Sequence, residues 1–152
     1  MTKPPLPPVS DRVKDVLERA GRFLEEEVIP LEAELRGRPW AAIEPRLYEM
    51  RRQVRARGLW LPQIPEEWGG LGLSLLEFAQ VSELLGRSPF GHFLFNCQAP
   101  DAGNMEILIE HGTREQQDRW LRPLLAGKIR SCFSMTEPEY AGSNPLMMGT
   151  TA

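Results

Sequence analysis

Side chains that bind metals or form disulfides are scarce in this 152-residue sequence. It has two cysteines, Cys97 and Cys132, and two histidines, His92 and His111. The cysteines lack the close spacing of metal ligands and the histidines fall in different segments, so neither a metal site nor a disulfide framework is indicated. So few thiols suit a reducing compartment, and we therefore expect a cytoplasmic protein.

Long apolar runs are also missing. No stretch reaches the roughly 18 consecutive apolar residues that a membrane-spanning helix requires. Residues 1–10 have neither the apolar core of a signal peptide nor an Arg-rich amphipathic pattern. We therefore expect no membrane insertion and no targeting segment.

Neither sign of charge dominates the sequence. Eighteen lysines and arginines stand against 21 aspartates and glutamates, for a net charge of −3, and the two signs are interspersed. This distribution argues against a nucleic-acid partner. One basic cluster is expected to form a solvated helix face, with a phosphate site as the alternative. The cluster comprises Arg51, Arg52, Arg55 and Arg57.

Apolar residues are present in the proportion typical of a soluble globular domain, 41%, and they recur at helical spacing. Residues 1–9 are a Pro-rich arm, after which Ser10 is placed to cap a helix that runs to about residue 35. We expect this helix to be bent or interrupted at Pro30. Its apolar stripe comprises Val13, Val16, Leu17, Ala20, Phe23, Leu24, Val28, Leu31 and Leu35.

Four further helices are predicted before residue 127. The second carries Ile43, Leu47, Met50 and Val54 on one stripe and ends at Gly58. Residues 59–72 contain two prolines and three glycines and form an irregular loop, which its tryptophans anchor to the bundle. The remaining three helices are indicated by capping boxes at Ser74 and Glu77 and at Thr113 and Gln116, by the pattern of residues 100–110 and by a stop at Gly127.

From residue 128 the period of the pattern changes to two. Ile129, Ser131, Phe133 and Met135 alternate with residues of the opposite face, which predicts a strand, and a second strand is predicted within residues 147–152. Two short strands need further strands or a packed partner. The expected fold is therefore all-α over residues 10–127, followed in residues 128–152 by the start of an incomplete β domain.

Residues 133–143 combine closely spaced main-chain donors around Thr136 with a Gly-Ser pair at Gly142 and Ser143. Such a segment suits a planar, acceptor-rich ring or a phosphate, because main-chain N–H groups in turns bind anions and glycine permits close approach. Taken alone, a Gly-Ser turn is a weak signal, and an ordinary connection between strands is the better explanation.

Three segments of the sequence, found in the order of a known family, favour the ligand-binding interpretation over an ordinary connection between strands. Residues 135–138, Met-Thr-Glu-Pro, and 141–143, Ala-Gly-Ser, resemble the signature of acyl-CoA dehydrogenases, and residues 65–72, Pro-Glu-Glu-Trp-Gly-Gly-Leu-Gly, and 112–123 are similar to that family's loop and next helix. Residues 96–106 are similar to the branch related to phosphotransferase-fused acyl-CoA dehydrogenases. Asn144 stands where the family usually has aspartate, which leaves that contact open.

The resemblance implies an all-helical N-terminal domain, a central β domain and a C-terminal helical domain, with FAD between them. It places Phe133, Ser134, Met135 and Thr136 against the flavin ring, and Gly142 and Ser143 near the pyrophosphate. Ser143 also corresponds to a substrate-binding position on the CoA arm.

The reaction that the resemblance implies is the α,β-dehydrogenation of an acyl-CoA to a trans-2-enoyl-CoA, with hydride transfer to flavin N5. The family's catalytic base lies far downstream, so we expect no catalytic residue in this chain and a structural role for Glu137. This oxidoreductase chemistry also implies an acyl-CoA substrate, an electron acceptor and a homo-oligomer. Acyl-CoA oxidases and nitroalkane oxidases share the architecture and remain open.

Two hypotheses follow. The first is that the chain is the N-terminal piece of an FAD-dependent acyl-CoA dehydrogenase, inactive and unable to hold FAD alone. The second is a non-catalytic helical interaction or assembly module. Residues 96–105 are expected either to line an acyl pocket or to pack. Both histidines are expected to cap helices or face solvent, and both cysteines to be inert packing residues.

Overall fold

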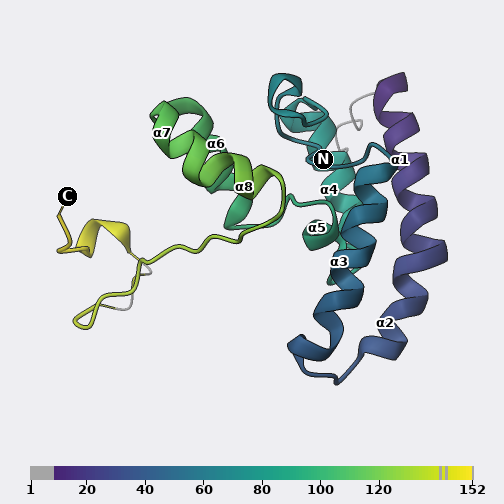
Figure 1. The fold of residues 1–152 in the computed structure, drawn as a ribbon, viewed down its shortest axis with the longest axis horizontal. Helices are drawn as coiled ribbons and strands as arrows, with labels where there is room; N and C mark the ends of the chain where they lie inside the picture. The colour runs from purple at the N-terminus through teal and green to yellow at the C-terminus, as the bar shows by residue number, and fades with distance from the viewer. Residues whose placement is uncertain (1–8, 141, 143, 152) are drawn as a thin grey trace, which may run out of the picture.

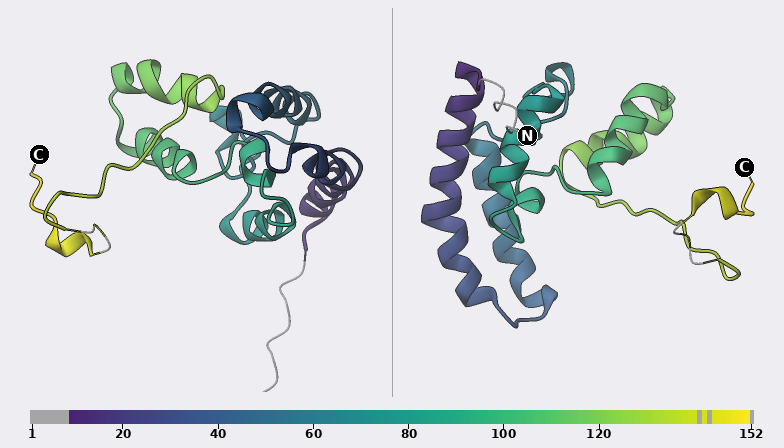
Figure 2. Two further views of the ribbon diagram at one scale, coloured as in Figure 1. Left: turned by 90° about the horizontal axis from the view of Figure 1, so that it is seen from below. Right: turned by 180° about the vertical axis from the view of Figure 1, so that it is seen from behind.

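The structure is a computed structural model that describes residues 9–140, 142 and 144–151. The first helical group contains two long antiparallel segments, one formed by α1 and α2 and the other by α3, with α4 and α5 beside them (Figures 1 and 2). A second group, formed by α6, α7 and α8, lies next to the first. The helices are α1 (Asp11–Phe23), α2 (Ile29–Leu35), α3 (Trp40–Ala56), α4 (Leu75–Leu85), α5 (Gly91–Leu94), α6 (Asp101–His111), α7 (Arg114–Gln116) and α8 (Arg122–Leu125).

The first helix is interrupted just before Pro30, as predicted, although the chain stays helical there. A π-helical turn, η1 (Leu24–Val28), joins α1 to α2, and Pro30 is the second residue after it. A proline removes one helical N–H and crowds the carbonyl four residues earlier, and a wider turn relieves both effects. The same arrangement recurs where η3 (Gln117–Leu121) precedes Pro123, so the chain twice accommodates a proline in this way.

The predicted cap of α1 at Ser10 and the predicted capping box of α4 at Ser74 and Glu77 are joined by hydrogen bonds. Ser10 accepts a hydrogen bond from the main-chain N–H of Val13, and its hydroxyl donates to Glu77 at 2.8 Å. Glu77 completes the capping box of α4 by accepting from the N–H and hydroxyl of Ser74, both at 2.9 Å. The Ser74 main-chain bond is the largest of the interactions that lower the pKa of Glu77. Both predicted caps are therefore confirmed, and one carboxylate links the N-terminal ends of α1 and α4.

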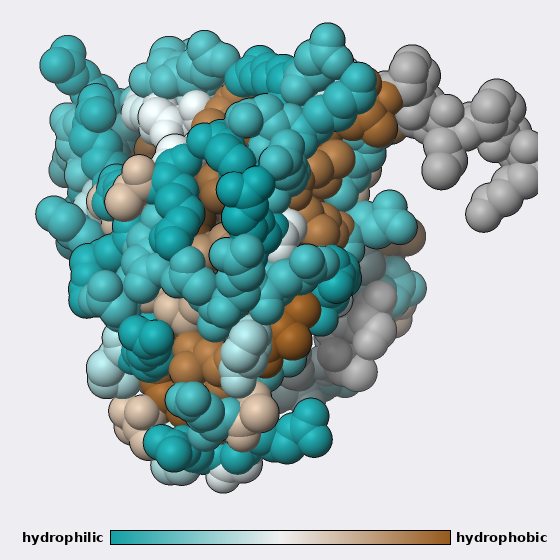
Figure 3. All heavy atoms as spheres, turned by 90° about the vertical axis from the view of Figure 1, so that its right-hand side faces the viewer, coloured by the Kyte–Doolittle hydropathy of each residue, from teal (hydrophilic) through white to brown (hydrophobic). Residues whose placement is uncertain are grey.

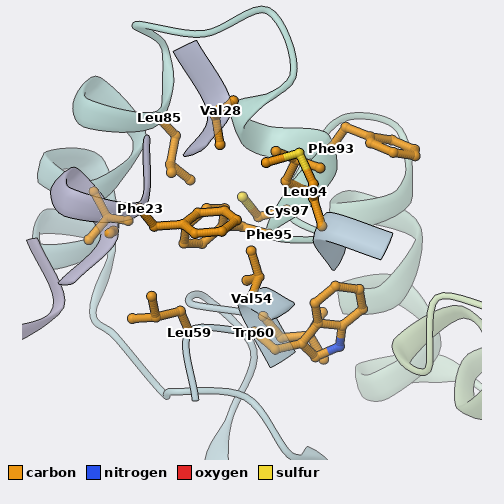
Figure 4. Packing of buried hydrophobic residues seen from close by; sticks show 14 of the residues in the cluster. Phe23, Val28, Val54, Leu59, Trp60, Leu85, Phe93, Leu94, Phe95 and Cys97 are labelled. Carbon is orange, nitrogen blue, oxygen red and sulfur yellow. The ribbon is translucent and has the colours of Figure 1, made fainter. Parts of the chain in front are cut away.

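Among the described residues, one hydrophobic cluster connects the two groups of helices. The rings of Phe23 in α1 and Phe95 after α5 meet edge to face, 6.2 Å between centres, in the middle of it (Figure 4). The predicted stripe of α3 lies in this cluster. Its largest fully buried side chains are Phe95, Leu24, Leu47, Met50, Leu59, Leu61, Ile64, Leu85, Leu94, Met105, Leu121 and Leu124.

The outer face of the first long helix is charged. Pairs at helical spacing, such as Asp15 with Arg19 and Glu18 with Arg22, lie on exposed positions of α1. Most of the surface seen from this side is hydrophilic, with apolar residues showing between the charged ones (Figure 3). None of the described helices is long and apolar enough to cross a membrane.

The loop over residues 59–72 is irregular, as predicted, apart from the short 3-10 turn η2 (Glu66–Trp68). Gly70 folds back so closely on the main-chain oxygen of Ile64 that an added Cβ would lie 2.0 Å from it. The buried indole of Trp60 donates to the main-chain oxygen of Leu125 at 2.9 Å, which fastens the loop to the end of α8.

The predicted strands are absent from the described part of residues 128–152. The chain leaves α8 at Gly127, which has a φ of +67°, and continues without regular structure to the short 3-10 turn η4 (Pro145–Met147). A strand exists only through ladder hydrogen bonds to a neighbour, and none of the described segments lies alongside residues 129–136 to supply them. The strands predicted from the period-two pattern are therefore wrong for the described residues.

Candidate functional site

The candidate site is the open chain that follows Gly127, which we call the distal segment (residues 128–137). It leads away from the helices (Figure 1). Phe133 is 56% and Met135 41% exposed, and Ser134 and Thr136 are exposed as well. Within the described chain, the main-chain N–H groups of residues 132–136 donate to no acceptor. The predicted ring-contacting residues thus present apolar side chains and unused donors together.

The base of the distal segment is held by Asp101, the first residue of α6, whose side chain is fully buried. One carboxylate oxygen accepts from the main-chain N–H and the hydroxyl of Ser131, both at 2.7 Å. The other accepts from Nε of Arg130 at 2.6 Å and from the amide of Gln98 at 2.8 Å. Four donors on one buried carboxylate make this a fully satisfied anchor.

The charge of Asp101 is stabilised within this anchor. Burial raises the pKa of the carboxyl, but the hydrogen bonds from Ser131, then Arg130 and Gln98, outweigh burial and hold the pKa below its usual range. The N-terminal end of α6 also favours a negative charge there. Asp101 is therefore ionised at neutral pH. Its role was not predicted from the sequence.

Two further contacts continue the anchor along α6. Asn104 donates to the hydroxyl of Ser131 at 2.9 Å. A Cβ added to Gly103 would lie 4.0 Å from the ring of Phe133, so that ring rests near the helix at a position without a side chain. The distal segment is thus fastened at residues 130 and 131 and lightly supported at residue 133.

Arg51 corrects the prediction of a solvated basic cluster. It is buried, donates to the main-chain oxygen of Phe93 and to Asn96 at 2.8 Å, and lies 4.8 Å from the Trp60 ring centre. Burial lowers the pKa of Arg51 to about 10, so the guanidinium stays charged at neutral pH. Arg52 is exposed as predicted.

Phe93 connects this buried arginine with the anchor. The Arg51 guanidinium lies 4.5 Å from the centre of the Phe93 ring, and that of Arg130 lies 5.2 Å from the same ring. Contacts of this kind between arginine and an aromatic ring are stabilising when they exclude water. The base of the distal segment therefore adjoins the polar centre of the bundle.

Residues 96–105 mainly serve packing in this structure. Asn96 has a φ of +57°, which asparagine tolerates, and its amide donates to the main-chain oxygen of Leu124 at 3.1 Å. Met105 is fully buried in the hydrophobic cluster. These contacts favour the packing alternative for Asn96 and Met105.

Glu137, the last residue of the distal segment, closes the loop that follows it. Its carboxylate accepts from the N–H groups of Gly149 at 2.8 Å and of Thr150 at 2.7 Å, and also from the Thr150 hydroxyl. These bonds, that from Gly149 first, lower the pKa of Glu137. Gly142, with a φ of +76°, lies within this loop, and Ser143 lies outside the described residues.

The remaining titratable candidates differ in their surroundings. Cys97 is buried in the hydrophobic cluster, which confirms its packing role, and burial raises the pKa of its thiol to about 12. Cys132 is exposed, so the packing role predicted for it is wrong. His92 is part-buried, with Nε2 2.8 Å from the Ser82 hydroxyl, and burial lowers its pKa. His111 is exposed, as predicted. Across the described residues, no cluster of three metal-binding side chains occurs.

A pocket of about 350 Å³ opens between the loop and the end of α8. Arg55 lies 5.4 Å from the ring centre of Trp60, and Arg122 lies 5.6 Å from that of Trp68. Both tryptophans therefore contact the bundle, as predicted, through arginines as well as apolar groups. None of the predicted ring-contacting residues lines this pocket.

The chain is similar to known proteins in family, sequence and structure. The family described as "Acyl-CoA dehydrogenase, N-terminal domain" matches residues 10–128. "Acyl-CoA dehydrogenase family member 10" of Mus musculus is 43% identical over 145 residues, which cover 90% of this chain and 14% of that protein. "Probable acyl-CoA dehydrogenase FadE2" of Mycobacterium tuberculosis is 40% identical over 150 residues, which cover 94% of this chain and 36% of that protein.

A solved structure agrees with these matches. The structure of a putative acyl-CoA dehydrogenase from Mycobacterium abscessus superposes with a TM-score of 0.84 at 38% identity, over 93% of this chain and 38% of the other. The chain therefore spans from about one seventh to little more than one third of the length of these similar proteins.

Proposed function

This chain belongs to the acyl-CoA dehydrogenase family, and we propose that it supplies the N-terminal helical domain and one wall of the flavin site of an FAD-dependent acyl-CoA dehydrogenase. In this proposal residues 10–127 are the helical domain, and residues 128–152 begin the central β domain. The observation that carries it is the distal segment, which holds apolar side chains and unused main-chain donors in the open beside a buried anchor.

The residues of the distal segment suit a flavin ring. The main-chain N–H groups of Met135 and Thr136, with the Thr136 hydroxyl, would donate to the ring's acceptor edge, and Phe133 and Met135 would cover apolar surface. Ser134 stands between these contacts. Gly142 and Ser143 would lie near the pyrophosphate, and Ser143 would also contact the CoA arm of the substrate. FAD, when bound, supplies the acceptor for the hydride.

The role of the chain in the reaction is to bind and orient, not to move the proton. A general base must take up a proton near neutral pH. Glu137 is the acidic residue next to the proposed contacts, but three donors already occupy its carboxylate, and its pKa is lowered rather than raised. The base would therefore come from the part of the enzyme that the chain does not match.

The proposal includes the conditions for activity. The distal segment offers one exposed wall, so we expect this chain alone to bind no FAD. An acyl-CoA substrate, an electron acceptor, a homo-oligomeric assembly and a cytoplasmic location belong to the proposal for the whole enzyme.

A chimera tests this function. This chain would replace the matching part of the Mycobacterium abscessus protein, and the visible flavin absorbance of the purified chimera would be compared with that of the unaltered protein. We expect a yellow chimera whose flavin is bleached by an acyl-CoA, and weaker flavin retention after Thr136→Val, which removes the hydroxyl but keeps the side chain's shape. A folded, colourless chimera beside a yellow parent would refute the proposal.

A second function has one specific observation in its favour. Leu75 is 86% and Leu76 51% exposed at the start of α4, and Ile107 and Trp120 are also exposed on the second helical group. Apolar residues on a surface suit an assembly module. Light scattering on this chain alone separates the two functions, because only the assembly module requires a stable oligomer without flavin.

A further inference from the structure

We propose that Asp101 is a positioning residue, whose buried carboxylate sets the place and direction in which the distal segment leaves the helices. This inference rests on the proposed function, since it concerns how Phe133, Met135 and Thr136 are presented. It assigns a role to a residue outside the signature that identifies the family.

The geometry of Asp101 points to this role. The side chain is fully buried at the first turn of α6, yet three of its four hydrogen bonds go to Arg130 and Ser131, about 30 residues further along the chain. An acidic residue at a helix start ordinarily serves its own helix through capping or the helix dipole. Here the carboxylate instead binds the main-chain N–H of Ser131, within the distal segment and just before its exposed residues.

The anchor transmits position over a short distance. Only four residues separate Ser131 from Thr136, and the chain between them has no regular structure. Extended chain advances about 3.3 Å per residue, so a rotation or shift at Ser131 displaces the donors of Met135 and Thr136 by a comparable or larger amount. Misplacement of about 1 Å at a site of this kind lowers reactivity strongly.

The rest of the distal segment offers little other restraint. Phe133 lies near Gly103 but is 56% exposed, and Ser134, Met135 and Thr136 are exposed. The helices, in contrast, are held by the hydrophobic cluster, in which Asp101 has no part. Loss of the carboxylate should therefore free the distal segment much more than it disturbs the bundle.

The chain carries a suitable probe position. Cys132 follows Ser131 and is exposed, whereas Cys97 is buried with a raised pKa, so a thiol-reactive nitroxide should modify Cys132 alone. Paramagnetic resonance of this label reports the mobility of the distal segment in the flavin-free chain. Asp101→Asn keeps the size of the side chain but places an amide N–H₂ or a weaker acceptor against the donors of Arg130 and Ser131.

The matched control is Asp118→Asn. Asp118 is an exposed carboxylate that accepts from Nε of Arg122 at 2.7 Å, and this bond does not involve the distal segment. We expect the rotational correlation time of the label to fall by at least about threefold in D101N and to stay unchanged in D118N. Both variants should keep the circular dichroism of the helices.

If D101N does not fold, Ser131→Ala replaces it, because Ser131 is only half-buried and lies outside the hydrophobic cluster. This variant removes one of the three bonds between Asp101 and residues 130–131, and also the acceptor of Asn104. A smaller rise in mobility is expected. A label that is equally restrained in the wild type and in the folded anchor variants would overturn the inference.

Measuring flavin retention in the chimera distinguishes a failure of the inference about Asp101 from a failure of the proposed function. In the chimera, D101N should weaken flavin retention at least about tenfold while D118N leaves it unchanged. A colourless wild-type chimera would count against the proposed function, and the label would still decide the inference. A yellow chimera whose D101N form retains flavin as tightly as the wild type would overturn the inference alone.

Discussion

The helical part of the chain buries its apolar side chains, whereas the distal segment leaves its apolar side chains exposed. In the helices, apolar side chains recur at three- and four-residue steps and meet in one cluster, and the buried polar groups Arg51, Asn96 and Asp101 have partners within the chain. In the distal segment, apolar side chains alternate with polar ones and remain exposed. A helical pattern is completed by neighbouring helices, whereas an alternating pattern needs a partner strand or ligand that the described chain does not supply.

The largest test of this contrast removes a buried partner from the helices. Arg51→Ala leaves a cavity beside Trp60 and Phe93 and deprives Asn96 of a donor. We expect a loss of about 4 kcal/mol in the free energy of unfolding, measured by urea denaturation. The label at Cys132 would also become more mobile, because Phe93 connects Arg51 with Arg130.

The neighbouring Arg52→Ala is the control for that change. Arg52 is exposed and paired with Glu49 on the same helix, and exposed pairs contribute little, so we expect a loss below about 1 kcal/mol. Equal losses in the two variants would show that Arg51 has no special role in the bundle.

A second test acts at the junction of the two regions. Gly127 has a φ of +67°, and an added Cβ would lie 2.6 Å from Nη2 of Arg51 and 2.9 Å from the ring of Trp60. Gly127→Ala should therefore lower the free energy of unfolding by about 2 to 3 kcal/mol, measured by thermal or urea denaturation.

Gly37→Ala separates the two causes of that loss. Gly37 has a similar φ of +76°, but nothing lies within 4 Å of its added Cβ. Only the backbone term, about 1 kcal/mol, should appear there. A G37A loss as large as that of G127A would mean that the contact with Arg51 and Trp60 carries no cost.

The smallest effect is expected from acidification, which should loosen the distal segment before the helices. Because the folded-state pKa of Asp101 is lowered, its contribution to stability is present above the ordinary value of 3.8 and is lost as pH falls through the lower folded-state pKa. Label mobility at Cys132 should stay constant down to about pH 4 and rise below it. The step should be absent in D101N, and a step above about pH 5 would contradict the assignment to Asp101.

Local patterns predicted most of the helical part. The helix periods and the caps at Ser10, Ser74 and Thr113 depend on residues within one turn of each other, and all three caps form. The π-helical turns before Pro30 and Pro123 were not predicted, because a proline signals a disruption without saying how the chain accommodates it.

The site was predicted less completely, for a physical reason. The family signature leads to Thr136 and its neighbours, but Asp101 gains its role from residues about 30 positions away, which no local pattern reveals. Arg51 could have been recognised: it lies four residues after Leu47 and three before Val54, on the buried stripe of α3. An arginine on an apolar stripe indicates a buried cation, but Arg51 was grouped with the neighbouring arginines as part of one solvated face.

The shared cap of α1 and α4 has a consequence for how the bundle opens. Ser10 and Ser74 both depend on the single carboxylate of Glu77, so neither helix end can fray without disturbing the other. Segments that lose their hydrogen bonds together exchange their amide protons together. The first turns of α1 and α4, which are distant in sequence, therefore behave as one cooperative unit of local unfolding that is linked by the carboxylate of Glu77.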